Sequence, residues 1–183
     1  MRYVVVLAFL CACSKSGPAP AAIIGPSEAG ADQIGQRAPA LDGVRWLDGD
    51  ADGDRLHLVR WWTDGCSLCS SSAPELTRIA AAFPDDLRFS AIFHDKRGRA
   101  TIDDAWLRET AAATGFDSCR IGVDPGWAAL RAWWLDRGGR RFTSVTFLLD
   151  REGVIRLIHT GGTVTPDEAA DIERMVRHLL DSQ

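Results

Sequence analysis

The chain has 183 residues, of which 46% are hydrophobic and 25% are charged. This composition is that of one ordinary globular domain, and it excludes a disordered chain, a collagen-like chain and an array of domains. The net charge of −4 predicts no basic surface, so nucleic acid is not an expected partner.

The first residues have the layout of an export signal. Arg2 supplies a single positive charge, and residues 3–10 form a short apolar run. The segment LCACS, residues 10–14, resembles the cleavage box of bacterial lipoproteins. The resemblance implies that residues 1–12 are a signal peptide and that Cys13 receives a lipid. An uncleaved cytosolic N-terminus with a chance apolar run is the alternative.

This start also predicts a location. The apolar run is too short to cross a membrane as a helix, so the lipid would be the only contact with the membrane. We therefore expect the protein in the bacterial cell envelope, facing the periplasm, with the outer membrane favoured by Ser14 behind the modified cysteine. The composition of residues 14–33, rich in Ser, Gly, Pro and Ala, predicts a lipidated Cys and flexible tether over residues 13–33. The folded domain would occupy residues 34–183.

Strand and helix patterns alternate along this domain. Apolar and alternating stretches predict strands over residues 55–62, 87–94, 121–123, 142–149 and 154–159. Helical spacing predicts helices over residues 66–83, 102–114 and 125–135, and a last helix that begins at Pro166 with Thr165 as its N-cap. This order predicts an α/β fold with a mixed central sheet and helices on both faces.

Two cysteines form the motif Cys66-Ser-Leu-Cys69. This spacing suits either a redox pair or half of a zinc site. A zinc site needs further ligands, but only Cys119 remains in the domain, and the four histidines are scattered without ligand spacing. An oxidising compartment favours a disulfide. We therefore expect no metal, and no cofactor beyond the redox-active disulfide itself.

The place of the motif assigns a role to each sulfur. Residues 63–65 predict a turn between a strand and a helix, so Cys66 lies where the helix begins. Free N–H groups and the helix dipole favour an anion there, which lowers the pKa of a thiol. Cys66 is the expected nucleophile, and Cys69 is the expected resolving thiol.

The stretch LVRWWTDGCSLCSSSAPEL resembles the active-site strand, Cys-x-x-Cys and first helix of thioredoxin-fold proteins, most of all the membrane-tethered thiol–disulfide oxidoreductases of the TlpA/ResA type. Pro74 lies where that helix carries its kinking proline. The later stretch TSVTFLLDREGVIRLIHTGG resembles the family's hairpin. The resemblance covers about residues 34–181 and implies a thioredoxin-like fold of the redoxin superfamily. It also implies exported protein thiols or disulfides as substrates and a membrane or periplasmic electron-transfer partner, with the direction of electron flow left open.

The chain departs from the family where a cis-proline loop receives the substrate backbone. Ser144 stands at the proline's position, so a cis peptide bond is in doubt there. Ser144 and Val145 are still the expected substrate contacts. The alternative is an ordinary strand.

Arg60 stands where the family keeps a buried acid, and an arginine cannot act as a base. By strand alternation it shares a face with Leu58 and Trp62. Close to the thiols it would stabilise a thiolate and make the pair more oxidising. The favoured alternative is a stem lying over Trp62 with a solvated or ion-paired head. Glu75 is a candidate substitute acid, with a solvated helix residue as its alternative.

Two other functions stay open. Thr63 matches one position of the peroxide-binding loop of peroxiredoxins, but Val59 stands where that loop has proline. A redox-inactive or metal-binding thioredoxin-like module is the other alternative, although related copper carriers use a Cys-x-x-x-Cys spacing. Cys119 is expected to be a small buried hydrophobe, and His94 and His159 are expected to be solvated loop residues.

Overall fold

The computed structural model describes residues 23–49, 54–138, 140 and 142–182. The predicted signal peptide over residues 1–12 and the predicted lipidation site Cys13 lie outside the described residues.

A mixed sheet of seven strands forms the centre of the described chain. Its order is β1-β7-β6-β3-β4-β5-β2. The central strand β3 runs parallel to β4 and antiparallel to β6, and β7 is antiparallel to β6. The strands are β1 (Ile23–Ile24), β2 (Arg45–Trp46), β3 (Leu56–Trp62), β4 (Leu87–Phe93), β5 (Arg120–Val123), β6 (Thr146–Leu149) and β7 (Ile155–His159).

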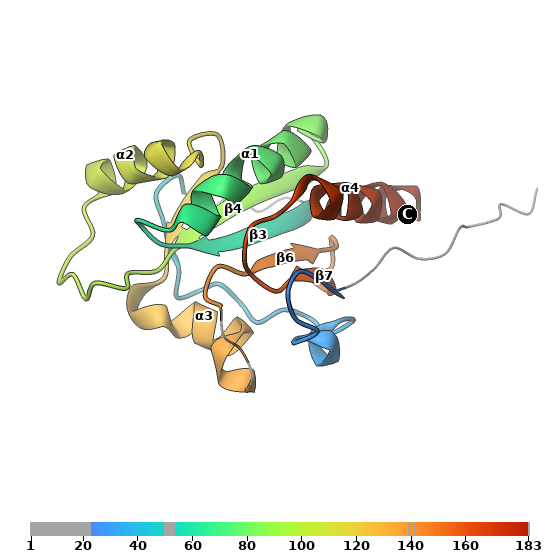
Figure 1. Ribbon diagram of the computed structural model, residues 1–183, viewed down its shortest axis with the longest axis horizontal. Helices are drawn as coiled ribbons and strands as arrows, with labels where there is room; N and C mark the ends of the chain where they lie inside the picture. The colour runs from blue at the N-terminus through green and yellow to red at the C-terminus, as the bar shows by residue number, and fades with distance from the viewer. Residues whose placement is uncertain (1–22, 50–53, 139, 141, 183) are drawn as a thin grey trace, which may run out of the picture.

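Helices cover both faces of this sheet, as the sequence predicts (Figure 1). On one face lie α1 (Ser67–Ala82), α2 (Asp104–Thr114) and α4 (Pro166–Asp181), and on the other lies α3 (Ala128–Trp133). Short 3-10 helices are η1 (Ala31–Gln33), η2 (Pro125–Trp127) and η3 (Leu135–Arg137). The arrangement confirms the predicted α/β architecture.

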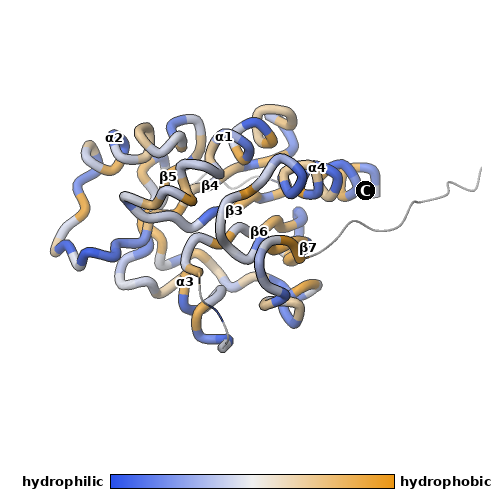
Figure 2. Tube along the Cα trace, viewed as in Figure 1, coloured by the Kyte–Doolittle hydropathy of each residue, from blue (hydrophilic) through white to orange (hydrophobic). Residues whose placement is uncertain are grey.

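Alternation along β3 separates two apolar cores. Leu58 and Trp62 pack in the core under α1, whereas Val59 and Trp61 pack in the core on the side of α3. Successive side chains of a strand point to opposite faces, so one buried strand serves both cores. Hydrophilic and hydrophobic residues alternate along α4 in Figure 2, which matches a helix that buries one face.

Local signals predict several element boundaries correctly. Cys66 is the N-cap of α1, and Pro74 lies inside that helix. Thr165 and Glu168 form a capping box at the start of α4, with Pro166 at its first position. The helix α2 ends at Gly115, whose φ of 95° is left-handed.

The helix predicted over residues 125–135 is wrong as a single element. Gly126 and Trp127 have left-handed φ angles of 63° and 65°, so the chain breaks into η2, α3 and η3. The buried carboxylate of Asp124 accepts hydrogen bonds from the N–H groups of Ala129 and Leu130 at 2.9 and 2.7 Å, and it thereby starts a new helix. The strand predicted over residues 142–149 is also shorter, since β6 begins at Thr146.

The flexible tether predicted over residues 13–33 is wrong for residues 23–33. Ile23 pairs with Ile158, so β1 extends the sheet beyond β7. The side chain of Gln33 is buried, and its Nε2 donates to the carbonyl of Trp133 at 2.7 Å. The composition of this segment resembles that of a tether, but the segment includes two β-branched residues, Ile23 and Ile24, which cover a sheet edge. Residues 23–33 therefore belong to the folded domain, which was predicted to begin at residue 34.

Candidate active site

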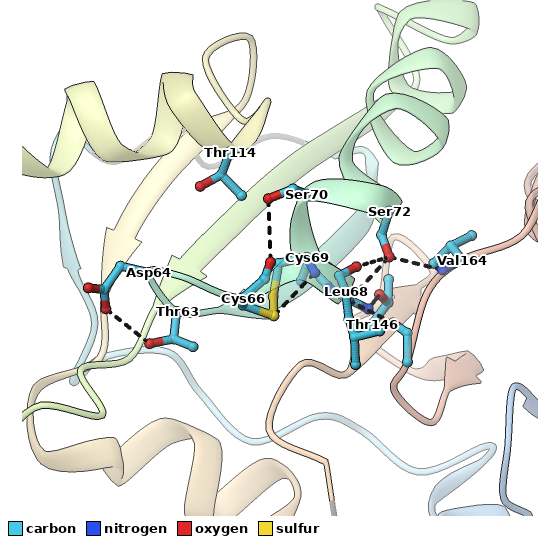
Figure 3. The surroundings of a disulfide bond; sticks show 12 residues. Thr63, Asp64, Cys66, Leu68, Cys69, Ser70, Ser72, Thr114, Thr146 and Val164 are labelled. Carbon is cyan, nitrogen blue, oxygen red and sulfur yellow. Dashed lines mark hydrogen bonds between the residues drawn. A yellow bond between two sulfur atoms is a disulfide. The ribbon is translucent and has the colours of Figure 1, made fainter.

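The two motif cysteines form a disulfide at the start of α1, with their Cα atoms 5.2 Å apart (Figure 3). The Sγ of Cys66 accepts a hydrogen bond from the backbone N–H of Cys69 at 3.1 Å. Cys66 is partly exposed, whereas Cys69 is fully buried. An incoming sulfur can therefore reach Cys66 and not Cys69, which is the arrangement that the sequence predicts for a nucleophile and a resolving thiol.

An ion cluster holds the turn that precedes Cys66. Asp64 pairs with Arg99 at 2.6 Å and with Arg97 at 3.1 Å, and Arg99 also pairs with Asp95. Partial burial acts to raise the pKa of Asp64, but its hydrogen bond to Arg99 and the two positive charges lower that pKa overall. This cluster was not predicted from the sequence, although the basic run after the strand, residues 96–99, was an available signal.

Thr63 takes part in the same turn. It is buried, and its hydroxyl donates to a carboxylate oxygen of Asp64 at 3.4 Å. This contact gives Thr63 a role in the turn.

Arg60 lies on the inner side of α1 and is fully buried. Its guanidinium donates to Thr146 Oγ1 at 3.0 Å, to Ser72 Oγ at 3.4 Å and to the carbonyl of Gly162 at 3.2 Å. The expected face, shared with Leu58, is confirmed. The solvated or ion-paired head is wrong, because the guanidinium bonds neutral groups in the interior. Burial lowers the pKa of Arg60 to about 9, so the side chain is charged at neutral pH.

Ser72 joins this arginine to the helix that carries the disulfide. Its hydroxyl donates to the carbonyl of Leu68 at 2.7 Å and accepts from the N–H of Val164 at 2.9 Å (Figure 3). With the bond from Arg60, the hydroxyl makes three contacts. The first turns of α1, β3 and the loop before α4 are thus held together at one point.

Glu75 has a partner away from the thiols. Its carboxylate pairs with Arg78 at 3.1 Å, and Arg78 also pairs with Glu173 of α4 at 2.9 Å. This network lies on the surface between α1 and α4, as expected for a solvated helix residue. A contribution of Glu75 to the thiol pKa stays a prediction.

The two expected substrate contacts lie just before β6. Ser144 is buried, with 6% of its surface exposed. The side chain of Val145 is fully buried in the core with Trp61, and its carbonyl accepts the N–H of Trp61 at 3.0 Å. No cis peptide bond occurs among the described residues. In this structure the Val145 side chain is closed to a partner, so only its backbone could meet a substrate.

The expectation of solvated histidines is wrong for both residues. His94 and His159 are fully buried. Burial lowers the pKa of His94 to about 3 and that of His159 to about 4, so both are neutral at pH 7. The ring of His94 packs edge-on against Trp127, with 5.0 Å between ring centroids. Both imidazole rings are buried by segments that are distant in the sequence. A local sequence pattern cannot predict such burial.

Cys119 is a half-buried free thiol. It donates to the carbonyl of Phe116 at 3.1 Å, and burial raises its pKa to about 12. A thiol with that pKa is a poor nucleophile, which agrees with the expected packing role.

Within residues 23–49, 54–138, 140 and 142–182, no three His, Cys, Asp or Glu side chains gather where they could share a metal ion. In the same residues, none of the helices has both the length and the apolar character that a membrane span needs.

Known proteins support the fold. No family model matches the chain. A solved thioredoxin-like protein in its oxidised form superposes with a TM-score of 0.61 at 23% identity, over 81% of this chain and 97% of that one. A putative thiol:disulfide interchange protein DsbE from Chlorobium tepidum has a TM-score of 0.60 at 19% identity, over 80% of this chain and 97% of that one. These superpositions confirm the thioredoxin-like fold.

The activity of one similar protein is consistent with the cysteine pair of this site. Thiol-disulfide oxidoreductase YkuV from Bacillus subtilis is 25% identical over 137 residues, which are 72% of this chain and 88% of that protein. A pair of cysteines that opens and closes as a disulfide can carry out thiol–disulfide exchange. Cys66 and Cys69 supply that pair at the N-terminus of α1. With this site on this fold, the chain is a thioredoxin-fold thiol–disulfide oxidoreductase.

Proposed function

We propose that the protein exchanges thiols and disulfides with exported proteins while a lipid holds it at a membrane of the bacterial envelope. The observation that carries the chemistry is the Cys66–Cys69 disulfide, whose outer sulfur is partly exposed and whose inner sulfur is buried. The relative YkuV, a thiol-disulfide oxidoreductase, supports the same class of substrate.

The exchange needs no group beyond the two sulfurs. A substrate thiolate attacks Sγ of Cys66, the disulfide breaks, and Cys69 leaves as a thiolate. A second substrate thiolate then attacks the substrate sulfur of the mixed disulfide and releases Cys66. The substrate ends as a disulfide, and the pair has gained two electrons. In the reverse direction the Cys66 thiolate attacks a substrate disulfide, and Cys69 displaces the reduced product.

Ser144 is the proposed contact for the substrate backbone. It lies two residues before β6, the strand that pairs with β3, and β3 leads into the turn before Cys66. Leu68, between the two cysteines, is the large apolar side chain most exposed among the described residues, at 39%. An exposed apolar residue beside the nucleophile suits contact with unfolded or flexible segments of a partner protein.

The place in the cell follows from the start of the sequence. The export signal and the lipoprotein-like box support a lipid on Cys13, with a membrane or periplasmic protein as the electron-transfer partner. The test is metabolic labelling with palmitate in a bacterial host. Label is expected on the wild-type protein and absent from Cys13→Ser, which should be released from the membrane fraction. Label that persists in Cys13→Ser contradicts the anchor.

A redox titration tests the chemistry. The full chain is equilibrated in graded ratios of reduced and oxidised glutathione, alkylated, and mapped by mass spectrometry. A reversible two-thiol step at Cys66 and Cys69, with Cys119 outside it, is expected. Absence of that step in folded protein contradicts the proposal. Rapid turnover of hydrogen peroxide would support a peroxidase instead, and tight copper binding by the reduced protein would support a metal-binding module.

A further inference from the structure

Arg60 is a buried positive charge whose direct partners are all neutral. It donates to two hydroxyls and one carbonyl, and its Nε has no hydrogen-bond partner among the described residues. No ion pair joins it to a carboxylate within those residues. Burial of a charge without a counter-charge is costly, so a negative charge that forms nearby is stabilised.

The cation contacts the helix that carries the redox pair. Its partner Ser72 follows Cys69 by three residues, which is about 4.5 Å along a helix axis. Figure 3 shows Cys66, Cys69 and Ser72 on the first turns of α1, with Thr146 beside them. The N-terminus of the same helix already favours an anion at Cys66, and Arg60 adds a full positive charge at Ser72 on the first turns of that helix.

Two further groups belong to the surroundings of Arg60. His159 is neutral and feels the charge of Arg60, which helps burial to lower its pKa. Glu168 approaches His159 at 3.5 Å, but its carboxylate also accepts from the N–H and hydroxyl of Thr165 at 2.8 Å each. The carboxylate of Glu168 therefore has His159 and Thr165 as partners and forms no ion pair with Arg60 within the described residues.

The two redox states differ in the charge that faces Arg60. The disulfide is neutral, whereas the reduced pair carries a thiolate. We propose that Arg60 stabilises the reduced pair over the disulfide, so that the disulfide is a strengthened oxidant and takes electrons from substrate thiols. Two substrate thiols then become a disulfide, and the two electrons stay on Cys66 and Cys69. This inference rests on the proposed exchange chemistry.

The first test compares equilibrium constants with glutathione for the full chain and its variants. Arg60→Met removes the charge and keeps much of the volume, whereas Arg60→Lys keeps the charge. Arg156→Met removes a cation that pairs with Asp150 at the β6–β7 turn, and it serves as the matched control. We expect Arg60→Met to disfavour reduction about tenfold, a midpoint lower by about 30 mV. Arg60→Lys and Arg156→Met should stay within about threefold of wild type.

The outcomes distinguish a failure of the proposed exchange chemistry from a failure of the proposed role of Arg60. A folded wild type with no reversible two-thiol step overturns the exchange chemistry itself. A reversible step that Arg60→Met leaves unchanged overturns only the role of Arg60. Near-ultraviolet circular dichroism reports whether each variant is folded.

A second measurement needs no variant. The rate of Cys66 alkylation in reduced wild-type protein is followed against pH, with each cysteine resolved by mass spectrometry. The pH midpoint of the Cys66 alkylation rate is expected below the ordinary thiol pKa of about 8.5. A midpoint at or above that value overturns the inference, even if Arg60→Met does not fold. Where Arg60→Met folds, its midpoint should be higher than that of wild type.

Discussion

The backbone N–H of Cys69 donates to Sγ of Cys66 at 3.1 Å, so a sulfur occupies the N-cap position of α1. Serine, threonine, aspartate and asparagine oxygens usually make this contact. The N–H groups at a helix start lack partners inside the helix and attract negative charge. The bond that caps the helix in the oxidised protein therefore favours a thiolate on the exposed cysteine after reduction.

This relationship predicts unequal effects of the two cysteine substitutions. Cys69→Ser keeps the exposed nucleophile and removes the thiol that resolves the mixed disulfide. We expect it to accumulate mixed disulfides at least about tenfold over Cys66→Ser, measured by non-reducing gels and mass mapping of the linked peptide. Equal trapping by both variants would show that the buried sulfur is as accessible as the outer one.

Acid should destabilise the protein through its buried histidines. His94 and His159 have folded pKa values of about 3 and about 4, below the usual 6.5. Between the folded pKa values and pH 6.5, the unfolded chain binds more protons than the folded chain. The stability is therefore fully present above pH 6.5 and falls as the pH drops. Each histidine should cost roughly 2 kcal/mol between pH 7 and pH 5.

Urea unfolding at pH 7 and pH 5 measures this loss. His94→Gln should remove its own share of roughly 2 kcal/mol from the pH dependence, to which His57 also contributes because burial lowers its pKa. Its packing change lowers stability at both pH values. His178→Gln, at an exposed position of α4, is the control and should leave the dependence as in wild type. A dependence that His94→Gln does not reduce contradicts the assignment.

The turn before Cys66 should loosen when Asp64 loses its charge. Asp64→Asn removes the pairing with Arg97 and Arg99, and partly solvated pairs of this kind contribute at most about 1 kcal/mol. The folded pKa of Asp64 is lowered, so its contribution exists above the unfolded value and is lost as the pH falls through the folded value. Thermal unfolding at pH 7 and pH 3 checks the size and the sign. A larger effect of Asp64→Asn at pH 3 than at pH 7 would contradict it.

Two glycines with left-handed backbones should differ in their tolerance of alanine. A Cβ at Gly161, where φ is 114°, would overlap the side chain of Phe142. A Cβ at Gly65, where φ is 66°, would meet Arg97 at an ordinary 3.5 Å. Gly65→Ala should cost about 1 kcal/mol from backbone strain alone, and Gly161→Ala should cost roughly twice that or more. Denaturant unfolding of the two variants compares them directly, and equal costs would refute the steric argument.

Neighbouring residues were sufficient to predict the redox motif and its setting. The apolar stretch of β3, the turn after it and the helical spacing beyond Cys66 all lie within one short segment. The capping box at Thr165 and the stop at Gly115 depend on contacts a few residues apart. Periodicity and capping are local effects, so they can be inferred from the chain order alone.

Burial depended on segments that lie far apart in the chain. The guanidinium of Arg60 is enclosed by Thr146 and Gly162, which are 86 and 102 residues away. His94 is covered by Trp127, and Ile23 becomes a strand only because β7 offers it an edge. Local patterns describe which way a side chain points, but the tertiary packing determines whether water or protein meets it there. For that reason the head of Arg60, expected to be solvated or ion-paired, is buried and bonded to Ser72 of α1.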